Sequence, residues 1–456
     1  MKKLYIQTYG CQMNQYDSQR IAAVMSRLDY TLTDQISSAD LVLLNTCSVR
    51  DKAEQKVYSA LGSWKELKEA NADLVIAVGG CVAQQEGERL LQKVPHLDIV
   101  FGTHNVHKLP EMVKQVHRLR RRSVETAFYR DPSYMDNDWD GRPNVNGAKA
   151  YVTIMQGCNK VCSFCIVPHV RGREISRPST KILAEIKALT ERGVKEVLLL
   201  GQNVNSYGQT VPGELSFAAL LRRVNSIDGL RRIRFTTSHP QDLSCELIEA
   251  YASLEKVCEH LHLPVQSGAD TVLERMRRGY TRRQYLHRLS SLRAYCPDLA
   301  LSTDIIVGFP GETEEEFQQT LELLMEVKYD EIYSFTYSPR PHTVSARLFL
   351  DDVPDCVKKA RLQKVQQLQQ AISLGKNREK LGKIEEILVE GKARLKNGQV
   401  MGRTRTNRIV NVEGSLSLIG SLINVRITGA TANSLLGERH LVAESEPIFP
   451  AERETA

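Results

Sequence analysis

Three short apolar runs near the start of the chain each lead straight into a cysteine. They read LYIQTYGC, LVLLNTC and LVIAVGGC, and they end at Cys11, Cys47 and Cys81, which lie 36 and 34 residues apart. Such runs are typical of buried parallel strands, and QYDSQRIAAVMSRL between the first two has apolar residues at helical spacing. The pattern predicts a Rossmann-like parallel sheet. Because parallel strands share one carboxyl edge, we expect the three thiols to line one pocket, with Gly79-Gly80 allowing the turn into Cys81.

A second region, from 150 to about 337, repeats strand-like and helical patterns. Its apolar runs are AYVTIMQ, KEVLLLG, RRIRFTT, EHLHLPV, LSTDIIVGF and DEIYSFTY, and helical stretches such as STKILAEIKALTER lie between them. Thr313 and Glu316 form a capping-box pattern that predicts where the last of these helices begins. Six βα units predict a (β/α)6 partial TIM barrel, with its chemistry at the carboxyl ends of the strands.

The pattern changes after a charged helix expected at about 354 to 381. Short β runs follow, namely KIEEILVEG, QVMGRTRT, RIVNV, SLINVRITG and HLVA, and they predict a small antiparallel β-barrel. We therefore expect a multidomain α/β protein. Its parts are an amino-terminal sheet domain at 1–122, a linker at 123–149, the larger barrel with its following helix at 150–380, the small barrel at 381–444 and a tail at 445–456.

Composition narrows the classes of protein. With 456 residues, 42% of them hydrophobic and 25% charged, the chain has an ordinary globular composition. It shows no signal peptide and no 18-residue apolar span, so we expect a cytoplasmic protein without a membrane partner. Ten cysteines in a reducing compartment indicate metal ligands or buried thiols. Four of them lack partners at ligand spacing and are predicted to be buried: Cys245, Cys258, Cys296 and Cys356.

The strongest chemical pattern follows the first barrel strand. GCNKVCSFCIVPHVRGRE holds Cys158, Cys162 and Cys165 in CxxxCxxC spacing. An all-thiolate group suits an iron–sulfur cluster, and three ligands leave one iron without a protein ligand. The alternative is a zinc site completed by His169, although closed zinc sites usually use paired CxxC knuckles and no second pair occurs.

Other classes of protein stay open on the residues alone. His260 and His262 lie on one side of a strand, and with His239 and Asp304 they could form a barrel metal hydrolase. That reading uses none of the six positioned cysteines. A pure RNA-binding module would not need polar groups at the barrel strand ends, and an electron carrier would not need a basic barrel.

The CxxxCxxC loop, with Phe164 before its last cysteine, resembles the radical S-adenosylmethionine superfamily. Together with YGCQMN, NTCSVR, GGCVAQ and GFPGETEEEF, it makes the chain resemble a methylthiotransferase from Tyr5 to about Ala443. YGCQMNQYDS, HLPVQSGAD, VLERMRRGYTR and TYSPRPHT most resemble the MiaB type, which methylthiolates C2 of N6-isopentenyladenosine beside the tRNA anticodon. Sister branches act on threonylcarbamoyladenosine in tRNA or on a ribosomal-protein aspartate. PRPHT departs from the MiaB type, which usually has glycine where His342 stands.

The resemblance implies two 4Fe-4S clusters and S-adenosylmethionine. Cys158, Cys162 and Cys165 would hold the cluster that binds S-adenosylmethionine, and the three amino-terminal cysteines would hold an auxiliary cluster that carries the inserted sulfur. No catalytic residue beyond these ligands is expected. The predicted cofactor contacts are Phe164, Gln202, Ser238, Gln266 and Gly308. Gln202, Ser238 and Gln266 follow barrel strand ends; a hydrophobic plug would explain Phe164, and helix capping would explain Gly308.

The small barrel predicts the partner. Residues 392–412, KARLKNGQVMGRTRTNRIVNV, hold six basic residues and no acidic one. A solvated charge run is the ordinary interpretation, but on a small β-barrel these charges indicate a phosphate-binding face. The resemblance implies a TRAM domain that binds the tRNA anticodon stem-loop. We also expect an electron donor, a sulfur source and a monomeric chain, with the target base leaving its stack to reach the barrel mouth.

Overall fold

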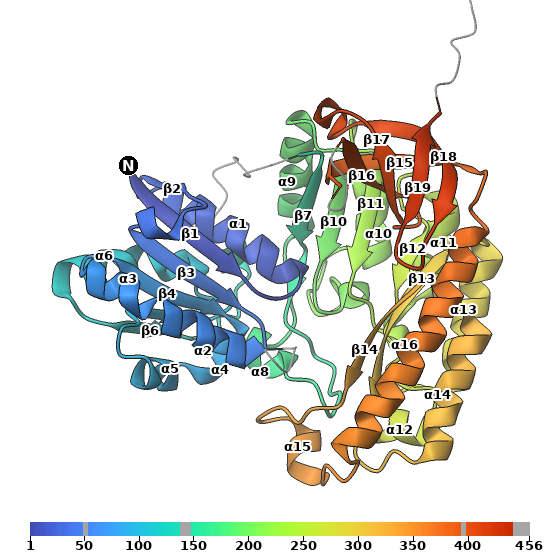
Figure 1. Ribbon diagram of the computed structural model, residues 1–456, viewed down its shortest axis with the longest axis horizontal. Helices are drawn as coiled ribbons and strands as arrows, with labels where there is room; N and C mark the ends of the chain where they lie inside the picture. The colour runs from blue at the N-terminus through green and yellow to red at the C-terminus, as the bar shows by residue number, and fades with distance from the viewer. Residues whose placement is uncertain (49–52, 137–146, 394–397, 441–456) are drawn as a thin grey trace, which may run out of the picture. The chain divides into compact units, whose positions relative to one another are not determined.

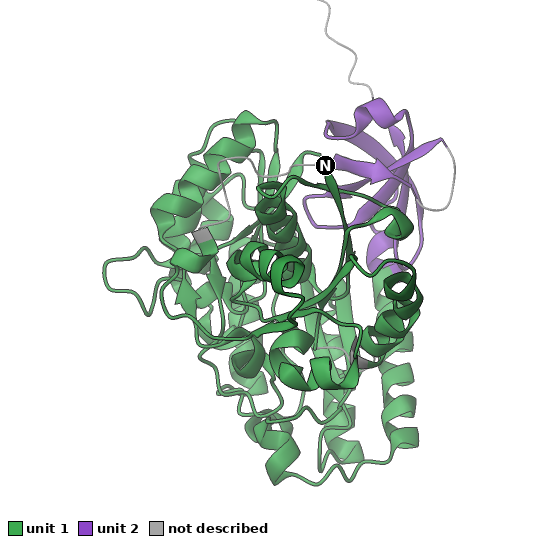
Figure 2. Ribbon diagram, turned by 90° about the vertical axis from the view of Figure 1, so that its left-hand side faces the viewer, with its two compact units in different colours: residues 1–373 green, residues 374–456 purple. Residues whose placement is uncertain are grey.

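The computed structural model describes residues 1–48, 53–136, 147–393 and 398–440. The chain forms two compact units, residues 1–373 and 374–456 (Figure 2). Residues 137–146 of the expected linker and all of the expected tail at 445–456 lie outside the described residues. Among the described residues, no helix has the length and apolar character that crossing a membrane requires.

The first unit begins with a parallel sheet whose strand order is β2-β1-β3-β4-β5-β6 (Figure 1). The prediction of a parallel sheet is confirmed, and the sheet continues beyond residue 122 because Ser123–Glu125 forms its edge strand β6. Its strands are β1 (Lys2–Thr8), β2 (Tyr30–Leu32), β3 (Leu41–Thr46), β4 (Val75–Gly80), β5 (Ile99–Phe101) and β6 (Ser123–Glu125).

Two apolar layers cover this sheet. Side chains of α1 and α6 pack on one face, and those of α2, α4 and α5 pack on the other. Strands β3 and β4 are buried along their whole length, which is why their sequences are continuously apolar. The helices are α1 (Gln12–Ser26), α2 (Ala53–Ser63), α3 (Lys65–Ala70), α4 (Cys81–Glu86), α5 (Glu88–Lys93), α6 (Leu109–Leu119) and, beyond the sheet, α7 (Ser133–Asp136).

The partial barrel consists of two three-stranded parallel sheets, β11-β10-β7 and β12-β13-β14, joined by a parallel bridge between Ile233 and Val257. All six predicted βα strands are present. They are β7 (Lys149–Thr153), β10 (Glu196–Leu200), β11 (Arg232–Thr236), β12 (His260–His262), β13 (Ala300–Val307) and β14 (Glu331–Thr336), with β8 (Met155–Gln156) and β9 (Ile175–Ser176) as a separate two-stranded ribbon.

Helices surround these strands, and most of these helices share one large apolar core with them. The Thr313–Glu316 capping box is present and starts α14 at Glu314, as predicted. The helices are α8 (Val167–Arg171), α9 (Ser179–Glu191), α10 (Phe217–Asn225), α11 (Cys245–Ser253), α12 (Asp270–Arg275), α13 (Arg282–Tyr295), α14 (Glu314–Val327), α15 (Val344–Leu348) and α16 (Asp355–Arg378).

The second unit contains a closed five-stranded barrel in the order β15-β16-β17-β19-β18. Two details differ from the prediction. The closing pair β17 and β19 is parallel, and the fifth strand is Leu435–Arg439 instead of HLVA, most of which lies outside the described residues. Buried and exposed residues alternate along LLGER, with Leu435 and Gly437 inward, but five residues are too few for this pattern to predict a strand. The strands are β15 (Ile384–Lys392), β16 (Gln399–Thr404), β17 (Ile409–Glu413), β18 (Leu422–Ala430) and β19 (Leu435–Arg439).

Candidate functional site

The three amino-terminal cysteines stand at the carboxyl ends of neighbouring parallel strands. Cys11 is the residue before α1, Cys47 follows β3 directly, and Cys81 is the first residue of α4. Because β1 pairs with β3 and β3 with β4, the three positions share one edge of the sheet. Cys47 and Cys81 are buried, whereas Cys11 is exposed.

Two glycines make this close approach possible. A Cβ at Gly10 would lie 2.6 Å from Cβ of Cys47, so only glycine lets the two cysteine-bearing segments pack together. Gly80 has φ +91°, and a Cβ there would lie 2.5 Å from the carbonyl oxygen of Thr46. The predicted need for glycine before Cys81 is therefore met by both backbone conformation and space.

Polar side chains fix the three strand ends to one another. Asn14 Nδ2 donates to the carbonyl of Thr46 at 2.8 Å, and Asn45 Nδ2 donates back to the carbonyl of Asn14 at 2.8 Å. Thr46 Oγ1 donates to the carbonyl of Gly79 at 2.6 Å and accepts from the amide of Val82 at 3.1 Å. Buried, satisfied polar networks of this kind hold loop ends in one arrangement.

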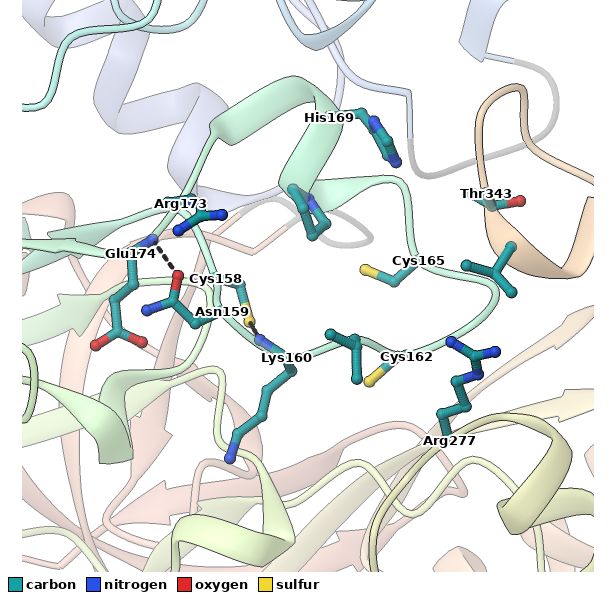
Figure 3. Close-up of a pocket in the computed structure, with 13 residues that line it drawn as sticks. Cys158, Asn159, Lys160, Cys162, Cys165, His169, Arg173, Glu174, Arg277 and Thr343 are labelled. Carbon is teal, nitrogen blue, oxygen red and sulfur yellow. Dashed lines mark hydrogen bonds between the residues drawn. The ribbon is translucent and has the colours of Figure 1, made fainter.

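The second group of cysteines lines a single cavity of about 530 Å³ (Figure 3). Cys158, Cys162 and Cys165 lie on the loop between β8 and α8 that borders this hollow. The cavity wall also holds Lys160, Val161, His169, Arg173, Glu174, Arg277 and Thr343, and no fourth cysteine. Burial raises the pKa of Cys158 to about 11 and that of Cys165 to about 12, and the neighbouring thiols add to both effects. The apo thiols thus need a cationic partner to ionise.

A buried arginine that was not predicted from the sequence donates a hydrogen bond to this loop. Arg278 Nη1 donates to Cys162 Sγ at 3.3 Å, and Nη2 donates to the carbonyl of Pro264 at 2.6 Å. Its Nε donates to the hydroxyl of Tyr280 at 2.9 Å, so all of its nitrogens are engaged. Nothing in RRGY signals burial, because paired arginines in a sequence usually indicate a solvated surface.

Helix α8 connects the two groups of cysteines. Thr103 Oγ1, beyond the end of β5, donates to the carbonyl of Val170 at 2.7 Å, and His104 Nε2 lies 2.9 Å from the carbonyl of Arg171. The Arg171 side chain, 3% exposed, donates to Asp17 Oδ2 at 2.8 Å. The helix after the CxxxCxxC loop is therefore held against the sheet edge that carries the other three thiols.

Two of the predicted cofactor contacts present unpartnered polar atoms. Ser238 follows β11 and Gln266 follows β12, and both side chains are buried. Ser238 Oγ and Gln266 Oε1 have no hydrogen-bond partner among the residues the structure describes. Buried polar atoms without partners are uncommon and indicate a bound group or water.

The other three predicted contacts are occupied by the protein itself. Gln202 Oε1 accepts from the amide of Gly157 at 2.5 Å, one residue before Cys158. Gly308 has φ +69°, and a Cβ there would lie 2.3 Å from Lys358. Phe164 packs against the apolar cluster around Met276 and does not line the cavity. These contacts position the loop and the turn, which is compatible with a bound group nearby but does not require one.

The residues of the two single-ion alternatives lie near one another but do not form an ion site: Cys158, Cys162, Cys165 and His169 line one cavity, and His262 Nε2 lies 3.5 Å from Asp304 Oδ1. Within the described ranges, no three His, Cys, Asp or Glu side chains are arranged to hold one metal ion. His262 Nδ1 lies 3.0 Å from Ser302 Oγ, which also contacts His260 at 3.3 Å. Burial, aided by the charges of Arg278 and Lys160, lowers the pKa of His239 to about 2.

The remaining four cysteines divide evenly. Cys258 and Cys296 are buried, as predicted, but the prediction is wrong for Cys245 and Cys356, which are exposed. Both exposed cysteines stand in the first turn of a helix, α11 and α16, where the side chain can point outward.

Some basic residues of the small barrel form contacts within their own unit. Arg403 Nε lies 3.3 Å from Glu390, and Arg408 donates to Asn377 in the last turn of α16. Lys392 is exposed and Arg405 is half-buried. Arg394 and Lys396, also in the predicted basic face, lie outside the described residues.

Three family models match successive parts of the chain. Residues 3–102 match Uncharacterized protein family UPF0004, residues 152–324 match the Radical SAM superfamily, and residues 378–439 match the TRAM domain. Among solved structures, the radical S-adenosylmethionine methyltransferase TsrM from Kitasatospora setae aligns with a TM-score of 0.56 at 13% identity, covering 76% of this chain and 77% of that one. That likeness concerns the fold alone.

Curated relatives match nearly end to end. The tRNA-2-methylthio-N(6)-dimethylallyladenosine synthase of Syntrophotalea carbinolica is 51% identical and covers 96% of this chain and 100% of its own. The enzyme of the same name from Geotalea uraniireducens is 52% identical and covers 96% and 98%. The chain belongs to the tRNA-2-methylthio-N(6)-dimethylallyladenosine synthase family, the MiaB type of radical S-adenosylmethionine methylthiotransferase.

Proposed function

We propose that this chain inserts sulfur and a methyl group at C2 of N6-isopentenyladenosine next to the tRNA anticodon. The observation that carries the proposal is the pair of cysteine groups, each brought to one place within the first unit. Relatives at 51% and 52% identity are named for this product. The hydrogen on C2 of the adenine ring is not acidic, and C2 carries no leaving group. A protein base alone therefore cannot replace this hydrogen.

The thiols of the CxxxCxxC loop fit a 4Fe-4S cluster. Cys158, Cys162 and Cys165 are an all-thiolate set around one hollow, and the absence of a fourth cysteine from its wall leaves one iron for S-adenosylmethionine. When bound, cluster and cofactor supply one-electron radical chemistry. Arg278 contributes by holding Cys162 in place and by offsetting the negative charge of the thiolates.

The strand-end polar atoms fit the cofactor's amino acid and ribose. Ser238 Oγ and Gln266 Oε1 are buried and have no hydrogen-bond partner in the described part of the chain, and they lie at the edge of the barrel where ligands bind. Gln202 supports the turn at Gly157. Phe164 and Gly308 are proposed as supporting contacts, the first through its ring and the second through its tight turn.

The strand-end thiols fit a second 4Fe-4S cluster with one open iron. Cys11, Cys47 and Cys81 come from three neighbouring strand ends, which asparagine and threonine side chains hold together. When bound, this cluster supplies the inserted sulfur, and a second S-adenosylmethionine supplies the methyl group. The protein's part is to hold the thiols, exclude water and set the local charge.

The substrate reaches the site as part of tRNA. The TRAM match and the basic residues of the small barrel support binding of the anticodon stem-loop through phosphates, which positions RNA without reading its sequence. The base must then leave its stack. We further propose a cytoplasmic, monomeric enzyme that takes electrons from a separate donor and sulfur from a separate source.

The decisive experiment is mass spectrometry of nucleosides. The chain would be expressed in a bacterial host that lacks its own methylthiotransferases, and its tRNA would be digested and analysed. We expect the methylthio group to appear on N6-isopentenyladenosine. Its appearance on threonylcarbamoyladenosine instead, or on neither, would reject the proposal.

A further inference from the structure

Arg171 reaches from the loop that carries one group of cysteines to the site that holds the other. It is the last residue of α8, six positions after Cys165. Its backbone carbonyl is 2.9 Å from His104 Nε2, and its Nη2 donates to Asp17 Oδ2 at 2.8 Å in α1. The guanidinium also interacts with the thiols of Cys81 and Cys11, so it lies close to the strand-end site.

The other end of this guanidinium is unsatisfied. Nη1 of Arg171 is buried and has no hydrogen-bond partner among the described residues. Cys81 packs in one apolar cluster with Ile166 and Val170 from the same loop and helix.

A second buried arginine stands nearby. Arg20, also on α1, is 2% exposed and donates to the carbonyl of Tyr134 at 2.9 Å. The charges of Arg20, Arg171 and Asp17 all act on Tyr134, so the three lie in one neighbourhood. Two guanidiniums and one carboxylate give these three residues a net positive formal charge.

A salt bridge that only holds the sheet to the loop does not explain this arrangement. Such a bridge is complete with Nη2 and Asp17, and it does not offset the cost of burying Nη1 without a partner among the described residues. A negatively charged sulfur species between the thiols would accept the free N–H and balance the charge.

We propose that Arg171 is a positioning residue of the Cys11–Cys47–Cys81 site, donating from Nη1 to an anionic inorganic sulfur held there. The proposal rests on the proposed function, which assigns a cluster to these three cysteines. The sulfur is either a sulfide of that cluster or a hydrosulfide bound at its open iron. Since Arg171 belongs to α8, the same helix fixes the sulfur relative to the CxxxCxxC loop.

The test uses the full chain in which Cys158, Cys162 and Cys165 are replaced by alanine, so that only the strand-end site can load. Midpoint reduction potential is measured by a redox titration monitored by electron paramagnetic resonance, and affinity is measured by titration with hydrosulfide. Arg171→Met removes a positive charge and should shift the midpoint to more negative values. It should also weaken hydrosulfide binding about tenfold or more, the effect of losing a charged hydrogen bond.

Asp17→Asn separates the two interpretations. It breaks the same ion pair from the other side but removes a negative charge, so the proposal requires a shift to less negative potential. A purely structural salt bridge predicts shifts in the same direction for both variants, or none. Arg177→Met, which removes a buried arginine paired with Glu185 at 2.8 Å, is the matched control and should leave the midpoint unchanged.

The other possible results distinguish failure of the proposed function from failure of the role of Arg171. If the parent chain loads no iron, the proposed function fails rather than the role of Arg171. If Arg171→Met does not fold, Arg171→Lys decides, because it keeps the charge but loses the planar donor: the midpoint should stay and hydrosulfide affinity should fall. Unchanged affinity in Arg171→Lys, or equal shifts in Arg171→Met and Asp17→Asn, overturns the proposal.

Discussion

The two groups of cysteines are built in opposite ways. Cys158, Cys162 and Cys165 lie within eight residues, so chain connectivity alone keeps them near each other. The strand-end thiols are separated by 36 and 34 residues, and only the register of the parallel sheet makes them neighbours. The first group needs one loop to close, whereas the second needs a whole domain to fold. We call them the loop triplet and the strand-end triplet.

The largest expected effect comes from removing either triplet. Reconstituted wild-type protein should hold about eight irons, from two clusters of four. Replacing the loop triplet by alanine should leave about four and abolish cleavage of S-adenosylmethionine, because no open iron remains to bind it. Replacing the strand-end triplet should also leave about four but keep cleavage and abolish thiolation. Iron and sulfide analysis with quantification of 5′-deoxyadenosine measures both.

Either of two results would contradict the roles given to the two triplets. Wild-type iron content in a variant would mean that the replaced cysteines are not ligands. Thiolation that survives without the strand-end triplet would mean that the inserted sulfur comes from elsewhere.

Glycine substitutions should damage one triplet at a time. Gly80→Ala places a Cβ 2.5 Å from the Thr46 carbonyl, and Gly157→Ala places one 2.0 Å from the Arg173 carbonyl, both at positive φ. Each should lose about four irons, from the strand-end and loop triplet respectively. Iron content and 5′-deoxyadenosine formation distinguish the two.

Controls for these glycines separate strain from collision. Gly87 and Gly193 also have positive φ, but a Cβ at either would meet nothing within 4 Å. Alanine there should cost about 1–2 kcal/mol of stability and no iron. Iron loss in the controls as large as in Gly80→Ala would show that backbone strain, and not the collision with Thr46, empties the site.

A smaller effect is expected from the threonine that joins two strand ends. Thr46→Val keeps the shape but removes the bonds to Gly79 and Val82, which should cost about 1–3 kcal/mol in unfolding free energy. It should speed loss of the strand-end cluster and leave the loop cluster in place. Iron release to a chelator, followed over time, measures this.

The matched control is Thr320→Val in the barrel. Thr320 Oγ1 accepts from the amide of Gly268 at 2.9 Å and is similarly buried. Its replacement should lower stability by a similar amount without changing the release rate from the strand-end site. Equal release rates in the two valine variants would mean that Thr46 acts only through global stability.

The sequence predicted the parts that depend on repetition and spacing. The six barrel strands, the parallel sheet and the loop triplet follow from periodic apolar runs and from cysteines close together. The convergence of the strand-end triplet also followed, because connectivity through helices makes strands parallel.

Long-range partners could not be predicted. Arg171 and Arg278 look like surface residues in the sequence, and their burial depends on acceptors 154 and 116 residues away. The fifth strand of the small barrel was misplaced because a short two-sided strand has little pattern of its own. Cys245 and Cys356 were expected inside because cysteine is usually buried, but helix position decides which way they point.

A buried charge cluster at the amino-terminal ends of the barrel strands provides a reference for both triplets, because it affects the stability of the fold without contacting either group of cysteines. Glu196 begins β10 and lies 3.1 Å from Arg234 and 3.4 Å from Lys149. Burial by itself raises the pKa of Glu196, but the charges of Arg234, Lys149 and Arg232 outweigh it and hold the pKa below its usual 4.5. A lowered pKa in the folded state contributes stability above pH 4.5, and that contribution is lost as the pH falls further.

Glu196→Gln should therefore unfold at lower denaturant than wild type at neutral pH, and the difference should shrink below about pH 4.5, by at most about 1.4 kcal/mol per pH unit for one proton. Urea titrations of the apo-protein between pH 3 and 7 measure this. Glu69→Gln is the control, because Glu69 pairs with Lys65 on an exposed surface and should show no such convergence. A constant difference for Glu196→Gln at every pH would mean that the side chain stabilises the fold through packing and not through its charge.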